Sequence, residues 1–224
     1  RKLEPYLVEY LRFGGYPAVV LEEDEEEKIL TLEDLHRSFL KKDILEAGVQ
    51  KEHAFYKTVS IIADESGGVM NASGIASSIG IAPDTVRSYL HLLQKSYIVS
   101  AVPPFHRNIR KELTKMPKVY FLDSGFRNAV LNDFRAPQER QDRGAILENA
   151  VHSALRNEEI RFWRTQDGRE VDFVVGERIA LEAKWDPSRF RANKYRSFQD
   201  SYPEIRLAPV GWSSEEFPDL FDLF

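Results

Sequence analysis

The sequence contains no cysteine among its 224 residues. Disulfide frameworks and thiolate metal sites are therefore excluded, which is compatible with a cytoplasmic protein without demanding one. There is also no secretory signal and no long uncharged apolar run, so neither export nor a membrane partner is indicated. From the class of protein we expect a cytoplasmic location.

An excess of positive charge is also lacking. The net charge is −5 and the isoelectric point is near 5.7. Affinity for phosphate backbones comes mainly from cations, so indiscriminate coating of nucleic acid is excluded and any DNA surface must be local. Six consecutive acids from Glu22 to Glu27 account for part of the negative net charge and indicate a solvated turn or helix start. The five histidines are too scattered to form a zinc site.

Two apolar runs near the C-terminal end carry acidic residues at strand spacing. Residues two apart on a strand point to the same side, so Glu182 and Lys184 share a face. A two-residue turn at Gly176 and Glu177 would place Glu182 on the opposite face of the sheet from Asp172. A three-residue loop that includes Arg178 sets Asp172 opposite Glu182. We predict the longer loop or an equivalent bulge.

Carboxylates gathered in this way have a definite chemistry. Hard oxygen ligands from two or three acids hold Mg²⁺ or Mn²⁺, which polarises a phosphate and activates a water. Lys184 would orient that water or stabilise the developing negative charge. The alternative is that Glu182 and Lys184 form an ordinary exposed strand pair, because charged residues make up 30% of the chain.

The surrounding pattern favours the first interpretation. Residues 141–157 read as a helix, with Glu148 beside an apolar stripe. Strands are predicted at 160–165, 170–175 and 179–184, followed by a helix at 189–201 and a strand at 205–212. The predicted order is helix, three strands, helix, strand.

Upstream, the sequence has a helix-turn-helix outline. A helix at 55–65 precedes a short helix capped by Asn71, Gly80 permits a sharp turn, and Pro83 suits the start of the next helix. The outward side chains of that third helix are the candidate base readers: Thr85, Arg87, Ser88 and His91.

A predicted wing follows, with its first strand at 97–102 and the remainder reaching Lys118. Residues 106–118 carry a net charge of +4, because the segment has five basic residues and one acid, Glu112. The cations that could grip phosphates are Arg107, Arg110, Lys111, Lys115 and Lys118. The alternative is a winged helix that serves only as a protein-docking or spacer module.

The C-terminal pattern resembles the PD-(D/E)XK, or restriction-endonuclease-like, fold. The resemblance implies catalytic roles for Glu148 as the acid of the first helix and for Lys184 as the catalytic lysine. It implies that Asp172 and Glu182 are the metal ligands on the second and third strands, with Glu148 assisting. All four positions hold the expected residue types.

A wider resemblance rests on the strings at 13–17 (FGGYP), 120–125 (YFLDSG), 143–149 (RGAILEN) and 162–165 (FWRT). They are similar to the C-terminal half of predicted prokaryotic AAA-type ATPases, in which a P-loop domain precedes a winged helix and an endonuclease-like domain. This chain has no Gly-x-x-x-x-Gly-Lys-Ser/Thr string and begins with Arg1. We therefore expect a fragment whose ATP-binding domain is missing and that does not itself hydrolyse ATP.

Together these observations predict an α/β (α+β) protein. Residues 1–50 would be a helical segment continuing from the ATPase domain, 51–118 a winged helix-turn-helix, and 119–224 the αβββαβ nuclease-like domain. Three functions remain open: a metal-dependent DNA endonuclease attached to its own ATPase domain, a DNA-targeting module without cleavage, and a platform for a protein partner.

Overall fold

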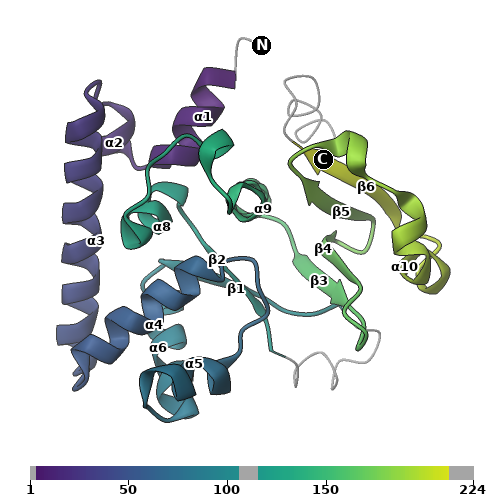
Figure 1. The fold of residues 1–224 in the computed structure, drawn as a ribbon. Coiled ribbons are helices and arrows are strands. Elements are labelled where there is room, and N and C mark those ends of the chain that lie inside the picture. The colour runs from purple at the N-terminus through teal and green to yellow at the C-terminus, as the bar shows by residue number, and fades with distance from the viewer. Residues whose placement is uncertain (1–3, 106–115, 212–224) are drawn as a thin grey trace.

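The computed structural model describes residues 4–105 and 116–211, and Figure 1 shows their arrangement. Those residues form helices with one two-stranded and one four-stranded sheet, which confirms the predicted α/β (α+β) class. The α-helices are α1 (Glu4–Phe13), α2 (Pro17–Val20), α3 (Glu25–Ala47), α4 (Glu52–Asp64), α5 (Ala72–Ile79), α6 (Pro83–Lys95), α8 (Ser124–Leu131), α9 (Arg143–Ala154) and α10 (Arg196–Ser201). Short 3-10 turns are η1 (Pro137–Glu139), η2 (Pro187–Arg189) and η3 (Ala192–Tyr195). The strands are β1 (Val99–Val102), β2 (Lys118–Phe121), β3 (Ile160–Arg164), β4 (Glu170–Val175), β5 (Ile179–Lys184) and β6 (Arg206–Gly211).

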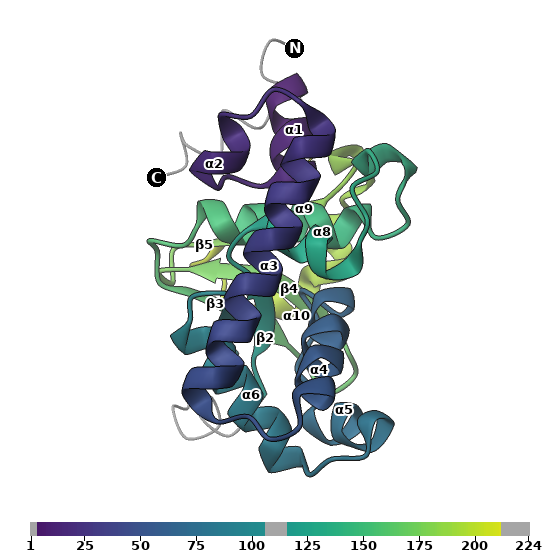
Figure 2. The same ribbon diagram turned by 90° about the vertical axis from the view of Figure 1, so that its left-hand side faces the viewer.

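Helix α3 is the long element at the front of Figure 2 and joins two cores. Near its start, Leu32 packs with Phe13 and Val19. Near its end, Leu40 and Ile44 enter a core shared with α4, α5, α6, β1, β2 and α8. The helical segment, the three-helix unit and the first sheet therefore pack as one body.

Local signals at α5 and α6 act as predicted. The Asn71 side chain accepts a hydrogen bond from Gly74 N, Gly80 ends α5 with a φ of 79°, and Pro83 is the first residue of α6. After α4, residues 67–70 run beside β2, where Gly67 N donates to Val119 O at 2.8 Å. The three helices are thus followed by antiparallel β1 and β2, with this extra segment at the edge of β2.

Two of the quoted strings meet in space. Asp123 caps α8 by accepting a hydrogen bond from Phe126 N, and its other oxygen accepts one from Gly15 N at 2.7 Å. Gly14 has a φ of +75°, and a Cβ there would lie 2.1 Å from the Asp123 carboxylate. The FGGYP string therefore forms a tight turn against the aspartate that starts α8.

The four-stranded sheet has the order β3-β4-β5-β6, with antiparallel neighbours except for the parallel pair β5 and β6. Val151 of α9 and Leu155, the residue after the helix, contribute to the core on one face. Phe198 of α10 packs on the other face with Val174 and Trp163. The predicted helix and strand order is confirmed, and it places α9 against β5 and β2, between α8 and the sheet in Figure 1.

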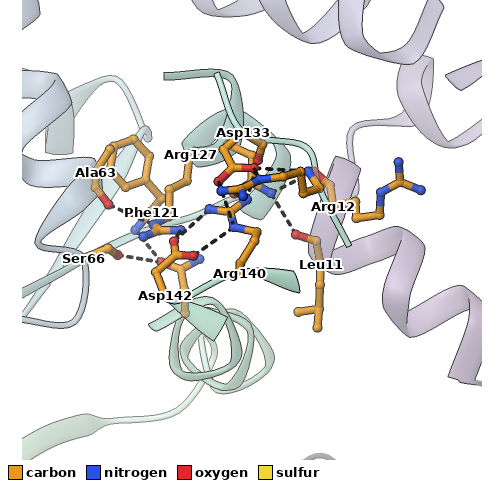
Figure 3. Close-up of polar contacts among 12 residues, drawn as sticks. Leu11, Arg12, Ala63, Ser66, Phe121, Arg127, Asp133, Arg140 and Asp142 are labelled. Carbon is orange, nitrogen blue, oxygen red and sulfur yellow. Dashed lines mark hydrogen bonds and ion pairs between the residues drawn. The ribbon is translucent and has the colours of Figure 1, made fainter. Parts of the chain in front are cut away.

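A buried polar network joins the helical part to the start of α9 (Figure 3). Asp142 accepts hydrogen bonds from Arg127 at 2.9 Å and from Arg140 at 2.7 Å. Arg127 also donates to the carbonyl of Ala63 in α4, and Asn128 donates to two carbonyls of α1. Helices α1, α4 and α8 are therefore tied together just before α9, the helix that carries Glu148.

In the part of the chain that the structure describes, none of the helices has the length and apolar composition needed to cross a membrane.

Candidate active site

The predicted site residues come from three neighbouring elements: Glu148 from α9, Asp172 from β4, and Glu182 with Lys184 from β5. The predicted three-residue loop between β4 and β5 is confirmed, because Val175 pairs with Ile179 and Phe173 with Leu181. Continued by one residue, this register sets Asp172 opposite Glu182.

A bulge adds something that the sequence pattern did not indicate. The pairing of β3 with β4 shifts by one residue between Arg161 and Trp163, which leaves an extra residue in β4. Strict alternation along β4 would place Val171 on the opposite face of the sheet from Val174. Both valines lie in the core with Phe198, because the bulge resets the alternation.

Asp172, which lies in this irregular stretch of β4, bridges two parts of the site. One carboxylate oxygen accepts a hydrogen bond from the backbone N of Ala183 at 2.9 Å. The other lies 3.2 Å from Nζ of Lys118. The side chain thus fixes the end of β5 while its second oxygen faces α9 and β2.

Lys118 connects the acids on that side. Its Nζ lies 3.0 Å from Glu148 Oε1, 2.6 Å from Glu170 Oε1 and 3.2 Å from Asp172 Oδ1, and its side chain is 1% exposed. Tyr120, two residues along the same strand, donates its hydroxyl to Glu148 Oε1 at 2.7 Å. We call Lys118 and the four acids Glu148, Glu170, Asp172 and Glu182 the carboxylate cluster.

Burial and mutual repulsion set the electrostatics of the carboxylate cluster. Burial, reinforced by the nearby charge of Asp172, raises the pKa of Glu148 to about 7 despite its hydrogen bonds from Lys118 and Tyr120. Burial alone would lower the pKa of Lys118, but the surrounding acids outweigh it and raise that pKa. The ammonium is therefore firmly protonated inside the cluster.

The fourth acid of the cluster, Glu182, forms the predicted pair with Lys184, which lies beside the cluster. The two side chains form an ion pair through Glu182 Oε1, and Glu182 is 6% exposed. Its other oxygen, Oε2, is buried without a hydrogen-bond partner among the described residues. Burial and then the charge of Asp172 raise the pKa of Glu182. The pair is mostly buried, unlike an ordinary exposed strand pair.

These donors match the oxygen ligands that Mg²⁺ and Mn²⁺ prefer, and Glu182 Oε2 is an acceptor without a partner. In the present arrangement, however, no group of three acids or histidines in residues 4–105 and 116–211 is placed to hold a metal ion. The space shared by Glu148, Glu170 and Asp172 contains the ammonium of Lys118. The donor chemistry fits such an ion, and Lys118 takes the place where these acids converge.

A cationic pocket opens beside Lys184. It has a volume of about 490 Å³ and is lined by Arg143, Lys184, Trp185, Asp186 and Arg189. Arg143 is the first residue of α9, and its guanidinium carbon lies 5.7 Å from the centre of the Trp185 ring. Positive side chains and one aromatic ring therefore adjoin the acids.

The predicted base readers lie on α6, whose Val86, Leu90 and Leu93 are buried in the core. Arg87, Ser88 and His91 are exposed, and Arg87 forms an ion pair with Asp84 of the same helix. Thr85 is half-buried and lines a pocket of about 350 Å³ together with Ser88. The predicted wing cations Arg107, Arg110, Lys111 and Lys115 lie outside the described residues.

Lys118 was counted with those wing cations, and that assignment is wrong. Its ammonium is buried among carboxylates and does not face solvent. A local signal exists in the sequence, because Lys118 opens an otherwise apolar strand and shares its face with Tyr120. A lysine in such a position needs acidic partners, but the sequence does not say that they lie 30 to 54 residues away. The roles of Glu170, Tyr120 and Arg143 were missed for the same reason.

Comparison with known families divides the chain into two parts. A family model described as a domain of unknown function, DUF8612, matches residues 4–136. This is more than half of the chain. The chain belongs to the DUF8612 family. A second domain of unknown function, DUF4143, matches residues 143–211. Lys118 thus lies in the DUF8612 region, and all four acids of the carboxylate cluster lie in the DUF4143 region.

Similar curated proteins include uncharacterized proteins of Mycobacterium bovis and Mycobacterium tuberculosis, each 26% identical over 92% of this chain and 49% of the relative. An uncharacterized protein of Haemophilus influenzae is 25% identical over 78% of this chain and 44% of the relative. The chain spans about half the length of the curated relatives it matches. No solved structure matches it.

Proposed function

We propose that this chain is the C-terminal DNA-binding and nuclease-like part of a prokaryotic AAA-type ATPase. Its DUF4143 region would hydrolyse DNA phosphodiesters with Mg²⁺ or Mn²⁺. The observation that carries the proposal is the gathering of Glu148, Asp172, Glu182 and Lys184 at one place, from one helix and two strands. This is the set of positions that the PD-(D/E)XK resemblance implies.

The residues divide the work by their chemistry. Asp172 and Glu182 supply the principal metal-binding oxygens, and Glu148 assists from α9. A bound divalent ion would polarise the phosphate and lower the pKa of the attacking water. Lys184, which is half-buried beside Glu182, supplies positive charge where negative charge develops on the phosphate.

The pocket beside Lys184 suits the path of a DNA strand. Arg143 and Arg189 present guanidinium groups that bind phosphate oxygens in pairs. Trp185 offers a ring on which an unpaired base can stack. Local positive charge next to the acids would bind DNA even though the chain as a whole is negative.

The DUF8612 region supplies the remaining support. Three helices followed by antiparallel strands, with residues 67–70 beside β2, are the order of a winged helix-turn-helix. Arg87, Ser88 and His91 are exposed on its third helix, where DNA contacts would lie. Curated relatives about twice as long leave room for the proposed ATPase domain, which would bind the ATP and be the partner of this part.

A second candidate is a module of the same ATPase that targets DNA or a protein partner without cutting. One observation favours it: an ammonium group, and not an open space, lies among Glu148, Glu170 and Asp172. In that case the acids and lysines would serve as a buried ionic link between the two regions.

The deciding experiment incubates the purified chain with supercoiled, linear and single-stranded DNA in Mg²⁺ or Mn²⁺. Cleavage that is lost in Asp172→Ala and Lys184→Ala supports the nuclease. Glu177→Gln is the matched control, because Glu177 is an exposed acid in the loop between β4 and β5. If the chain binds DNA in a salt-sensitive way but cleaves it with neither metal, the nuclease proposal is refuted in favour of DNA targeting. Neither activity, together with a retained protein partner, favours the interaction module.

A further inference from the structure

Lys118 occupies the point at which the acids converge. Three carboxylate oxygens from α9 and β4 lie within 3.2 Å of one nitrogen that is almost completely buried. This ammonium is the shared counter-charge of these three acids, of which Glu170 also pairs with Arg164. Without it, Glu148, Glu170 and Asp172 would repel one another in a site that water hardly enters.

The position of Lys118 is built into the backbone. The residue pairs with Val102 in β1 and bridges to Val69 on its other side. Along the side chain, Nζ lies 5.8 Å from the centre of the Phe162 ring. Because the lysine comes from the DUF8612 region and the acids from the DUF4143 region, the cation is delivered to the site by the neighbouring part of the chain.

We propose that Lys118 is the resident cation of the carboxylate cluster and competes with divalent metal for Glu148 and Asp172. This inference rests on the proposed metal-dependent function and adds a regulatory step to it. With the ammonium in place the acids stay assembled and the site holds no metal. Metal enters when the ammonium leaves, so a shift of β2 relative to α9 and β4 would control occupancy.

The competition follows from the shared oxygens. Asp172 has one oxygen bound to Ala183 N and the other at Lys118. Glu148 Oε1 accepts hydrogen bonds from Lys118 and Tyr120. A divalent ion needs several of these lone pairs at once and carries twice the charge of the ammonium, so the two cations exclude each other.

The test compares Lys118→Met, Lys118→Arg and the unchanged chain, with Lys57→Met as a matched exposed lysine on α4. Binding of Mn²⁺ is measured by calorimetry and by electron paramagnetic resonance, and the melting temperature is measured with EDTA and with Mn²⁺. Lys118→Met should bind Mn²⁺ at least about tenfold more tightly than the unchanged chain, a typical size for coupling between two ligands. It should melt lower in EDTA and regain stability in Mn²⁺. Lys118→Arg and Lys57→Met should behave like the unchanged chain.

A second measurement uses the unchanged chain in case Lys118→Met does not fold. The ¹⁵N signal of the Lys118 ammonium should shift as Mg²⁺ is added, in step with the heat of binding.

The outcomes separate this inference from the nuclease proposal. If the chain binds and cleaves with metal while the Lys118 signal and the affinity of Lys118→Met stay unchanged, the competition is refuted and the nuclease stands. If Lys118→Met gains metal binding while neither it nor the unchanged chain cleaves DNA, the competition stands and the nuclease fails. Absence of metal binding in every variant refutes both.

Discussion

Replacing Asp142 with asparagine should destabilise the protein strongly, because two buried arginines share this carboxylate. Arg127 and Arg140 have side chains that are 1% exposed, and both donate to Asp142 (Figure 3). Asparagine keeps the shape but removes the charge, and its amide group would face two other donors. Removing one partner of a buried ion pair costs about 3–5 kcal/mol. Asp142 itself is 31% exposed, so we expect the lower end, about 3 kcal/mol.

The assay is urea unfolding at neutral pH, monitored by circular dichroism. The dependence of the unfolding free energy on urea concentration is compared between variants to check two-state behaviour. Asp84→Asn is the control, since its ion pair with Arg87 is exposed and worth less than about 1 kcal/mol. Adding Arg127→Met to Asp142→Asn should restore part of the stability by removing one of the unpaired buried charges. A loss below about 1 kcal/mol in Asp142→Asn would show that this network does not hold α9 in place.

The loss of stability in Asp142→Asn should depend on pH. Burial opposes ionisation of Asp142, but Arg140 and Arg127 outweigh it and lower its pKa. The carboxylate therefore stabilises the folded chain above its unfolded pKa of about 3.9, and this stabilisation is lost as the pH falls through the lower folded value. The difference between the unchanged chain and Asp142→Asn should shrink in acid.

Three further predictions concern single buried groups. Burial lowers the pKa of His152 to about 4, so the protein should lose up to about 3 kcal/mol as the pH falls from 6.5 to 4; His152→Phe should remove this loss in urea titrations at several pH values. The pKa of Glu148 is raised to about 7, so the unfolding free energy should fall by up to about 3 kcal/mol as the pH rises from 4.5 to 7. Glu148→Gln should remove this fall in the same urea titrations. Gly125→Ala should lower stability by about 1–3 kcal/mol, because its Cβ would meet the carbonyl of Phe13 at 2.0 Å, whereas Gly144→Ala, with no atom in the way, should not.

The sequence was sufficient for local structure wherever the signal is local. Asn71, Gly80 and Pro83 mark the ends of two helices through their own backbone chemistry, and the structure has those helices. The order of α9, β3, β4, β5, α10 and β6 follows from periods of 3.6 and 2 in the apolar residues. The loop from Gly176 to Arg178 followed from asking which register brings two acids together.

What the sequence could not supply depends on contacts between distant segments. The β4 bulge arises where β3 and β4 pair, and no single residue in either strand indicates it. The role of Lys118 depends on acids in α9 and β4, so composition placed it with the wing cations. Arg143 likewise joins Lys184 in one pocket only because α9 begins beside the end of β5.

The carboxylate cluster also belongs to neither matched region alone. The DUF4143 region carries the acids, while the DUF8612 region supplies Lys118 and the Tyr120 hydroxyl. Gly67 completes the wall on that side, since a Cβ there would lie 3.1 Å from Glu148 Oε1. In the DUF4143 region Glu182 pairs with Lys184 and Glu170 with Arg164, but Glu148 and Asp172 have Lys118 of the other region as their cation. Buried acids must lose charge or find cations, so we expect these two to be protonated or to bind a cation where the DUF8612 region is absent. The stability of the site, and under the proposed competition its affinity for metal, therefore depend on the contact between the two regions, where Lys118 projects from β2 toward α9 and β4.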